Sequence, residues 1–171
     1  MSERPVVDSM KFAKESGELK GSVAVAELPR LHDLVLETGG CLDFGLHGQV
    51  DENGKPGLRV SVAGPLMLNC HRCLGPVDFR IDATRMFELV PVGTPLADVT
   101  EEPMDVEQVH ADPKMDVYTL VEDEVILALP MVIAHPEQDC ATPLTKVKPE
   151  ISMGSPFSVL AGQANKAKKI H

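Results

Sequence analysis

Apolar residues occupy every second position in three segments between residues 42 and 89. In residues 42–50 and 58–68 they fall on even numbers, and Gly48 fills the gap in the first segment. In residues 77–89 they fall on odd numbers, and Arg85 interrupts them. A period of two with one apolar side is typical of β-strands that bury one face. The pattern therefore predicts three half-buried strands.

The connections between these strands are short and rich in turn-forming residues. The connection at residues 51–57 contains Asn, Pro and two Gly residues, which favour a hairpin loop. The connection at residues 70–76 ends in Gly75-Pro76 and is also turn-like. Sequential strands with short links usually pair antiparallel, so we expect a β-meander. Upstream, residues 22–37 predict a short strand and a helical turn.

Residues 116–129 predict an α-helix. Asp116 is a suitable N-cap, and Pro130 ends the helix because proline cannot continue the hydrogen-bonding pattern. The second half of this segment, residues 125–129, is apolar on all sides, so we expect it to be buried against the sheet. Residues 91–114 contain Pro, Gly and acidic residues without apolar periodicity, and they predict a long solvated loop.

The chain of 171 residues has about the length of one domain, and 43% of its residues are hydrophobic. We expect a flexible N-terminal segment at residues 1–20, a single domain at 21–140, and a linker with a basic tail at 141–171. A short helix in the tail is expected to begin at Ser155, with Pro156 at its first position. The predicted fold class is α+β: an antiparallel β-meander with one packed helix and a short C-terminal helix or tail.

The net charge of −10 is unevenly distributed. Residues 101–124 hold nine acidic residues, with Lys114 as the one base, so this window carries a charge of −8. Proteins that coat nucleic acid through non-specific phosphate contacts are basic, and the acidity argues against that class. Aromatic residues make up 4% of the chain and Trp is absent, which leaves few platforms for stacking single-stranded bases.

The start of the sequence lacks the apolar segment of a secretory signal, and no window approaches the ~20 apolar residues of a membrane span. We therefore expect a cytoplasmic protein with no membrane partner. Four cysteines in that compartment favour free thiols or metal ligands over a disulfide framework.

Cys70 and Cys73 are separated by two residues on a predicted turn, a spacing that lets two thiolates share one tetrahedral ion. After the predicted helix, His135 and Cys140 can supply two further ligands, which would complete a Cys₃His zinc site. In the alternative interpretation Cys70 continues the apolar side of its strand, Cys73 is a turn residue and Cys140 is a loop thiol. A redox role is weaker, because redox CxxC motifs begin a helix near a βαβ unit. Cys41 opens the first strand and is expected to be a bystander.

Two charged residues fall on apolar faces. Glu124 lies on or beside the apolar stripe of the predicted helix, where an unpaired carboxylate would be destabilising. Arg85 breaks the alternation of the third strand. We hypothesise that Glu124 pairs with Arg85 or with Arg72. The alternative is that Glu124 lies at the rim of a solvated acidic face.

The sequence contains no GxSxG motif, Gly-rich phosphate loop or HExxH motif, so we expect no enzymatic activity. Basic residues gather near one end of the predicted sheet and in the tail, where they can contact RNA phosphates. These candidates are Arg72, Arg80, Arg85, Lys166, Lys168 and Lys169. The acidic window could instead make the protein an adaptor for a basic partner such as a ribosomal protein.

Four segments together resemble the YceD family, whose members are called large ribosomal RNA subunit accumulation proteins. These segments are Cys70–Pro76, Leu120–Pro130, His135–Cys140 and Ser155–Ala161. They occur in order in a match that extends from around Lys20 to the C-terminus. The combination of the C-x-R-C turn with V-E-D-E-[VI]-[IL]-L-A-L-P is what makes the resemblance specific.

The resemblance implies a bacterial, cytoplasmic, non-enzymatic factor that supports synthesis, processing or accumulation of large-subunit (23S) ribosomal RNA. Its expected partners are this RNA or a pre-ribosomal particle. The resemblance also implies a gene commonly near that of a small zinc-ribbon ribosomal protein. In many members the region matching His135–Cys140 is richer in cysteine and looks like the second half of a metal site. This chain keeps Cys140 there and offers His135.

Overall fold

The computed structural model describes residues 4–97, 106–136 and 140. The chain divides into two compact units, Met1–Cys140 and Ala141–His171. The second unit lies outside the described residues, as do the predicted linker, the predicted helix at Ser155 and the tail lysines within it. The first unit contains all the helices and strands that the structure describes.

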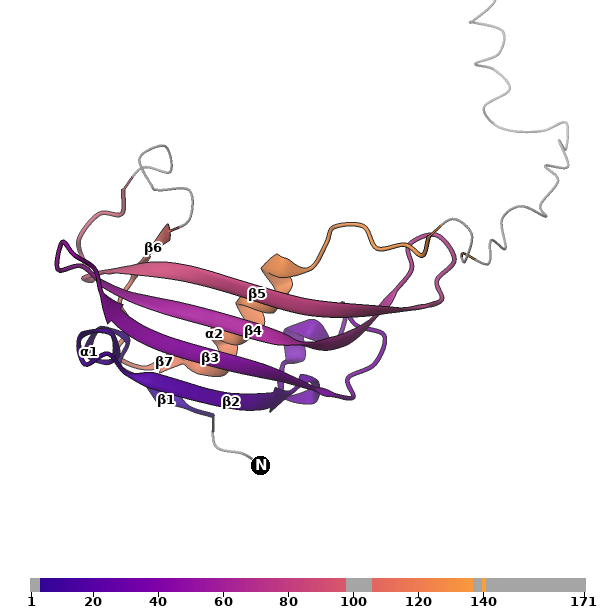
Figure 1. Cartoon of the computed structure of the whole chain (residues 1–171), viewed down its shortest axis with the longest axis horizontal. Coiled ribbons are helices and arrows are strands. Elements are labelled where there is room, and N and C mark those ends of the chain that lie inside the picture. Colours follow the sequence, from indigo (N-terminus) through magenta and orange to yellow (C-terminus); the bar gives the residue numbers. More distant parts are fainter. Residues whose placement is uncertain (1–3, 98–105, 137–139, 141–171) are drawn as a thin grey trace, which may run out of the picture. The chain divides into compact units, whose positions relative to one another are not determined.

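The first unit is built on a five-stranded sheet in the order β2-β3-β4-β5-β6 (Figure 1). The strands are β2 (Glu18–Ala24), β3 (Cys41–Val50), β4 (Pro56–Asn69), β5 (Pro76–Val90) and β6 (Val106–His110). Neighbours from β2 to β5 pair antiparallel, which confirms the predicted meander and the α+β fold class. β2 is followed by two 3-10 turns, η1 (Val25–Glu27) and η2 (Pro29–Leu31). The end of β2 and these turns correspond to the short strand and the helical turn predicted at residues 22–37.

The ladder between β4 and β5 runs without interruption from Gly57 opposite Glu88 to Asn69 opposite Pro76. The hairpin loop lies at one end of this ladder and the turn at residues 70–76 at the other. Because successive side chains in a strand alternate between faces, even positions of β4 and odd positions of β5 face the core. The sequence pattern predicted this orientation correctly.

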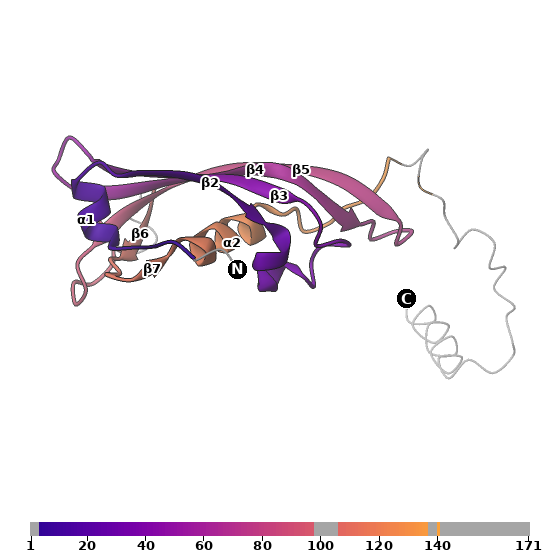
Figure 2. The same cartoon turned by 90° about the horizontal axis from the view of Figure 1, so that it is seen from below.

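The helix α2 (Val117–Ala128) covers one face of the curved sheet (Figure 2). Asp116 is its N-cap, because its carboxylate accepts hydrogen bonds from the backbone N–H groups of Tyr118 and Thr119. The helix ends directly before Leu129-Pro130. The predicted helix and both of its end signals are therefore confirmed.

α2 packs against the sheet through one stripe of residues spaced four apart. This stripe consists of Val117, Val121 and Val125, each of which is at most 1% exposed. Leu127 points away from the stripe and is 61% exposed. The expectation that residues 125–129 are buried against the sheet is thus confirmed for Val125 and wrong for Leu127, because only one side of the helix faces the sheet.

Two strands and a helix lie wholly or partly within residues 4–20, where we expected a flexible segment. β1 (Val6–Val7) pairs antiparallel with β7 (Met115–Asp116), and α1 (Ser9–Lys14) follows. The carboxylate of Asp8 caps α1 by accepting from the backbone N–H of Lys11. These elements are short, and their contacts with distant parts of the chain could not be derived from local patterning.

β6 lies within residues 91–114, which we expected to be a solvated loop. It pairs parallel to β5, with Met86 opposite Val106 and Val90 opposite His110. β6 has only two apolar residues, so its own pattern is too weak to predict a strand. Pairing with the backbone of β5 provides the hydrogen bonds that form it.

Candidate metal centre

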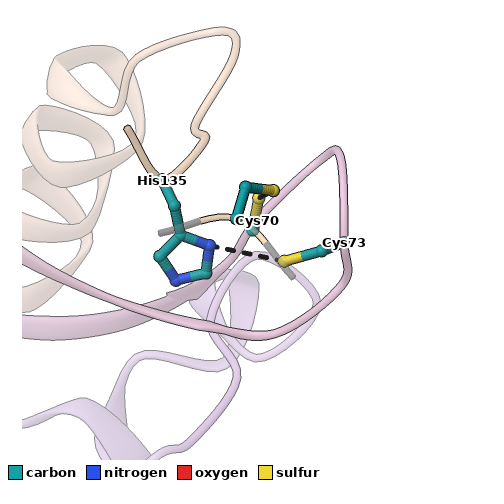
Figure 3. A group of neighbouring side chains, drawn as sticks. Cys70, Cys73 and His135 are labelled. Atoms are coloured by element: carbon teal, nitrogen blue, oxygen red, sulfur yellow. Dashed lines mark hydrogen bonds between the residues drawn. The ribbon is translucent and has the colours of Figure 1, made fainter. Parts of the chain in front are cut away.

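The turn at residues 70–76, between β4 and β5, forms a knuckle that contains the thiols of Cys70 and Cys73. The backbone N–H of Leu74 donates to the carbonyl of Cys70 at 2.8 Å, and the N–H of Cys70 donates to the carbonyl of Gly75 at 2.9 Å. Leu74 takes a left-handed conformation with φ of 61°. This tight turn places Cys70 and Cys73 on the same side of the chain (Figure 3).

The segment after α2 returns to the knuckle and brings the other two candidate ligands. The backbone N–H of His71 donates to the carbonyl of Ile133 at 2.8 Å, which attaches this segment to the turn. Two residues later, His135 faces the sulfur of Cys73 (Figure 3). Cys140 lies against Cys70 and is buried. The structure therefore brings together the four residues that the sequence suggested as a metal site.

The distances within this cluster fit one small tetrahedral ion. One potential ligand atom from each of the four residues lies within 4.8 Å of the others. The sulfurs of Cys70 and Cys140 are 3.8 Å apart, and the sulfur of Cys73 is 3.3 Å from Nδ1 of His135. Tetrahedral zinc with Zn–S bonds of about 2.3 Å would separate two sulfurs by roughly 3.8 Å. Three thiols and one imidazole are also a donor set that zinc prefers.

A hydrogen bond to the backbone orients the imidazole of His135. Its Nε2 lies 2.8 Å from the carbonyl oxygen of Pro76. Since a carbonyl can only accept, Nε2 carries the proton, and in the neutral ring Nδ1 keeps a lone pair directed at the cluster. Metal-binding histidines in proteins are commonly held in this way by a second hydrogen bond. The same contact to Pro76, followed by the nearby sulfurs, raises the pKa of His135.

Ionisation is not equally easy at each sulfur. Burial opposes ionisation of Cys70, but backbone hydrogen bonds involving Cys73, His135 and Arg72 outweigh it and lower the pKa of Cys70 to about 5. Burial, followed by the side chains of Cys73 and Cys70, raises the pKa of Cys140 to about 11. The cluster thus favours the thiolate of Cys70 and opposes ionisation of Cys140. A bound divalent cation would offset the repulsion between the two thiolates. Cys41 is exposed and lies outside this group.

The hypothesised pair of charged residues is formed between β5 and α2. Nε of Arg85 donates to Oε2 of Glu124 at 2.9 Å, and the Glu124 side chain is only 3% exposed. The guanidinium also lies 3.5 Å from a carboxylate oxygen of Glu107 on β6. These contacts give the buried carboxylate of Glu124 its partner and link β5, β6 and α2. Arg72, the alternative partner suggested by the sequence, lies on the knuckle.

The three arginines among the candidate RNA contacts do not all lie on one face of the sheet. Arg80 is exposed on the sheet face opposite α2, whereas Arg85 is on the face that carries α2, because the two residues are five positions apart and side chains alternate between faces along a strand. Arg72 is exposed on the knuckle. The three tail lysines, Lys166, Lys168 and Lys169, lie outside the described residues.

Sequence reasoning missed a second buried carboxylate on α2. Glu122 is 2% exposed and accepts a hydrogen bond from the backbone N–H of Arg30 at 2.6 Å. The Arg30 side chain also pairs with Asp123. The run of three acids within an otherwise apolar helix was a signal that more than one of them needed a partner.

The part of the chain that carries the knuckle and α2 matches a known family model. The model, described as large ribosomal RNA subunit accumulation protein YceD, matches residues 58–164. This chain belongs to the YceD family. The match includes every segment from which the resemblance was drawn, so the expectation from the sequence is confirmed.

A YceD relative extends the comparison to nearly the full chain. The protein named large ribosomal RNA subunit accumulation protein YceD from Haemophilus influenzae is 27% identical over 168 residues. The alignment covers 94% of this chain and 95% of the relative. No solved structure matches the chain. Among the described residues, no helix has the length and apolar character needed to cross a membrane.

Proposed function

We propose that this YceD protein is a non-enzymatic factor that supports accumulation of large-subunit ribosomal RNA by binding the RNA or a pre-ribosomal particle. The observation that carries the proposal is family membership over residues 58–164, a span that includes the knuckle and the segment packed against it. Exposed Arg72 on the knuckle and Arg80 on the adjacent half of the sheet would contact phosphates, together with the tail lysines. Arg85 is assigned a structural role, because its guanidinium is paired with two carboxylates.

The RNA proposal is tested with the full chain and a labelled fragment of large-subunit ribosomal RNA. The variant carrying Arg72→Ala and Arg80→Ala should bind several-fold more weakly and show a smaller salt dependence, since each lost phosphate contact reduces the slope by about 0.7–0.9. A second variant neutralises Lys166, Lys168 and Lys169 and should weaken binding in the same way. Fluorescence anisotropy at several salt concentrations measures both effects.

Arg59→Ala is the matched control for the arginine variant. Arg59 is also exposed on the face opposite α2, but it lies near the hairpin end of the sheet. Its replacement should leave RNA affinity almost unchanged. If the arginine and lysine variants together leave RNA binding intact, direct RNA contact by these residues is excluded.

We further propose that Cys70, Cys73, His135 and Cys140 hold one zinc ion. Bound zinc would tie the knuckle to the segment after α2 and stabilise that corner of the fold. Protein purified under reducing conditions without chelator should contain about one equivalent of zinc by elemental analysis, and Cys70→Ser should abolish it. Cys41→Ser is the control, because Cys41 lies outside the cluster.

The thermal midpoint gives a second measure of the zinc site. A chelator should lower the midpoint of the natural protein and of Cys41→Ser, but not that of Cys70→Ser, because a ligand stabilises only the state that binds it. Less than about a tenth of an equivalent in freshly purified natural protein would contradict the site.

A second candidate function is that of an adaptor that binds a basic ribosomal protein. It is favoured by the carboxylates of Glu107, Asp123 and Glu124, which line one hollow of the molecule. These residues belong to the window that carries a charge of −8.

A further inference from the structure

A groove with apolar walls lies between α2 and the edge of the sheet formed by β5 and β6. Phe87 and Val109 form its strand side, and Leu120, Ile126 and Leu127 form its helix side. Its volume is about 270 Å³. Leu127 is 61% exposed here, so the helix presents a large apolar side chain at the mouth of the groove.

Three acidic residues and one basic residue, Arg30, are among those that line the groove. Glu107 and Asp123 have side chains that are 51% and 43% exposed, and both line the groove with Glu124. Arg85 and Arg30 neutralise part of this charge through Glu124 and Asp123. The contact of Arg85 with Glu107 is longer, at 3.5 Å. An exposed carboxylate therefore remains accessible beside the apolar walls.

We propose that this groove binds an amphipathic, basic helical segment of a partner protein. The proposal rests on the adaptor function and places it at a defined surface. One or two apolar side chains of the partner would enter between Leu127 and Phe87, while Lys or Arg residues flanking them would face Glu107. This is the helix-in-groove mode of recognition, in which apolar anchors supply affinity and rim charges supply register.

Two observations favour this occupant over others. The volume of about 270 Å³ is below the roughly 300–1,000 Å³ typical of small-molecule sites, and it suits inserted side chains. The carboxylates at the mouth would repel the phosphates of RNA, whereas they complement a cationic segment.

The groove is also separate from the proposed RNA surface. Phe87 lies near the hairpin end of β5, and the knuckle begins beyond its other end at Pro76. Substitutions in the groove therefore leave Arg72 and Arg80 in place. The peptide experiment and the RNA experiment can fail independently of each other.

The test measures binding of a fluorescent synthetic peptide to the full chain. The peptide is a helix with leucines on one face and lysines and arginines on the other, and a comparison peptide replaces every leucine with serine. The leucine peptide should bind the natural protein saturably and more tightly than the serine peptide. Leu127→Lys should weaken binding at least about tenfold, because it removes an apolar contact and adds repulsion.

Two matched controls isolate the groove. Leu34→Lys makes the same replacement at another exposed leucine, which is 44% exposed and does not line the groove. Glu107→Gln should weaken binding a few-fold, whereas Glu52→Gln in the exposed hairpin loop should not. Circular dichroism checks that each variant is folded. If Leu127→Lys does not fold, Leu127→Ser takes its place.

Equal binding of the two peptides, no binding of the leucine peptide, or equal loss in Leu34→Lys would each overturn the proposal. Loss of binding to the ribosomal RNA fragment in Leu127→Lys or Glu107→Gln would assign the groove to RNA instead, and would also overturn it. Normal RNA binding by these variants, together with loss of the leucine peptide, supports the protein partner.

Discussion

At the scale of single residues, Gly48 is a position where the sheet approaches α1 closely. A Cβ at Gly48 would lie 2.3 Å from the carbonyl oxygen of Phe12 and 2.8 Å from Cα of Ala13. The backbone N–H of Gly48 also donates to the carbonyl of Gly17 at 2.8 Å. The gap that Gly48 leaves in the apolar pattern of β3 is thus the space that α1 fills.

Gly48→Ala should therefore destabilise the protein by about 1–3 kcal/mol, because the new methyl group would displace backbone atoms that cannot move independently. Urea unfolding followed by circular dichroism measures the change in the free energy of unfolding. Gly39→Ala is the control, because no atom lies within 4 Å of its Cβ position and its φ is not positive. Equal stabilities of the two variants would show that α1 does not need this space.

Individual residues were predictable where they broke a pattern. Arg85 interrupts the alternation of a strand, and Glu124 lies in an apolar helix, so each indicated a need for a partner. Glu122 gave a weaker signal, because its partner is a backbone N–H that no sequence pattern reveals. Side chains that bond to distant backbone groups require the tertiary structure to be recognised.

At the scale of the elements, the start of α2 depends on Asp116. Its carboxylate accepts from the N–H groups of Tyr118 and Thr119 and pairs with the guanidinium of Arg4 at 3.0 Å. Asp116→Ala should lower the free energy of unfolding by about 1 kcal/mol, the usual effect of losing an N-cap.

Asp116→Asn separates the two contributions in the same denaturation experiment. Asparagine keeps the capping acceptor but loses the charge that pairs with Arg4, and a surface ion pair contributes little to stability. It should therefore retain most of the stability of the natural protein. If it is as unstable as Asp116→Ala, the ion pair with Arg4 accounts for the effect and the cap does not.

Long elements with a clear period were predictable, and short ones were not. β3, β4, β5 and α2 each extend over ten or more residues with apolar positions on one side. β1, β7 and α1 are too short for a period to be read, and β6 has a mixed composition. These short elements form through pairing or packing with partners that are distant in the sequence.

At the scale of the whole first unit, the candidate metal cluster combines residues from two segments more than sixty positions apart. The Cys-x-x-Cys spacing indicated half of the site from the sequence alone. The other half depended on the direction in which the chain returns after α2, which the helix length and Pro130 only suggested. The groove beside Leu127 was not predictable, because the apolar residues 125–129 indicated a helix end buried against the sheet.

The continuous β4–β5 ladder also determines how the two ends of this unit are related. From Phe87 to the start of β5 at Pro76 the strand extends roughly 35 Å, and the register shows no bulge along it. The strand pair would therefore hold a molecule bound at the knuckle and another bound beside Leu127 at a fixed distance from each other. Inserting two residues into each of these strands would lengthen that spacing by about 7 Å and leave every side chain on its present face.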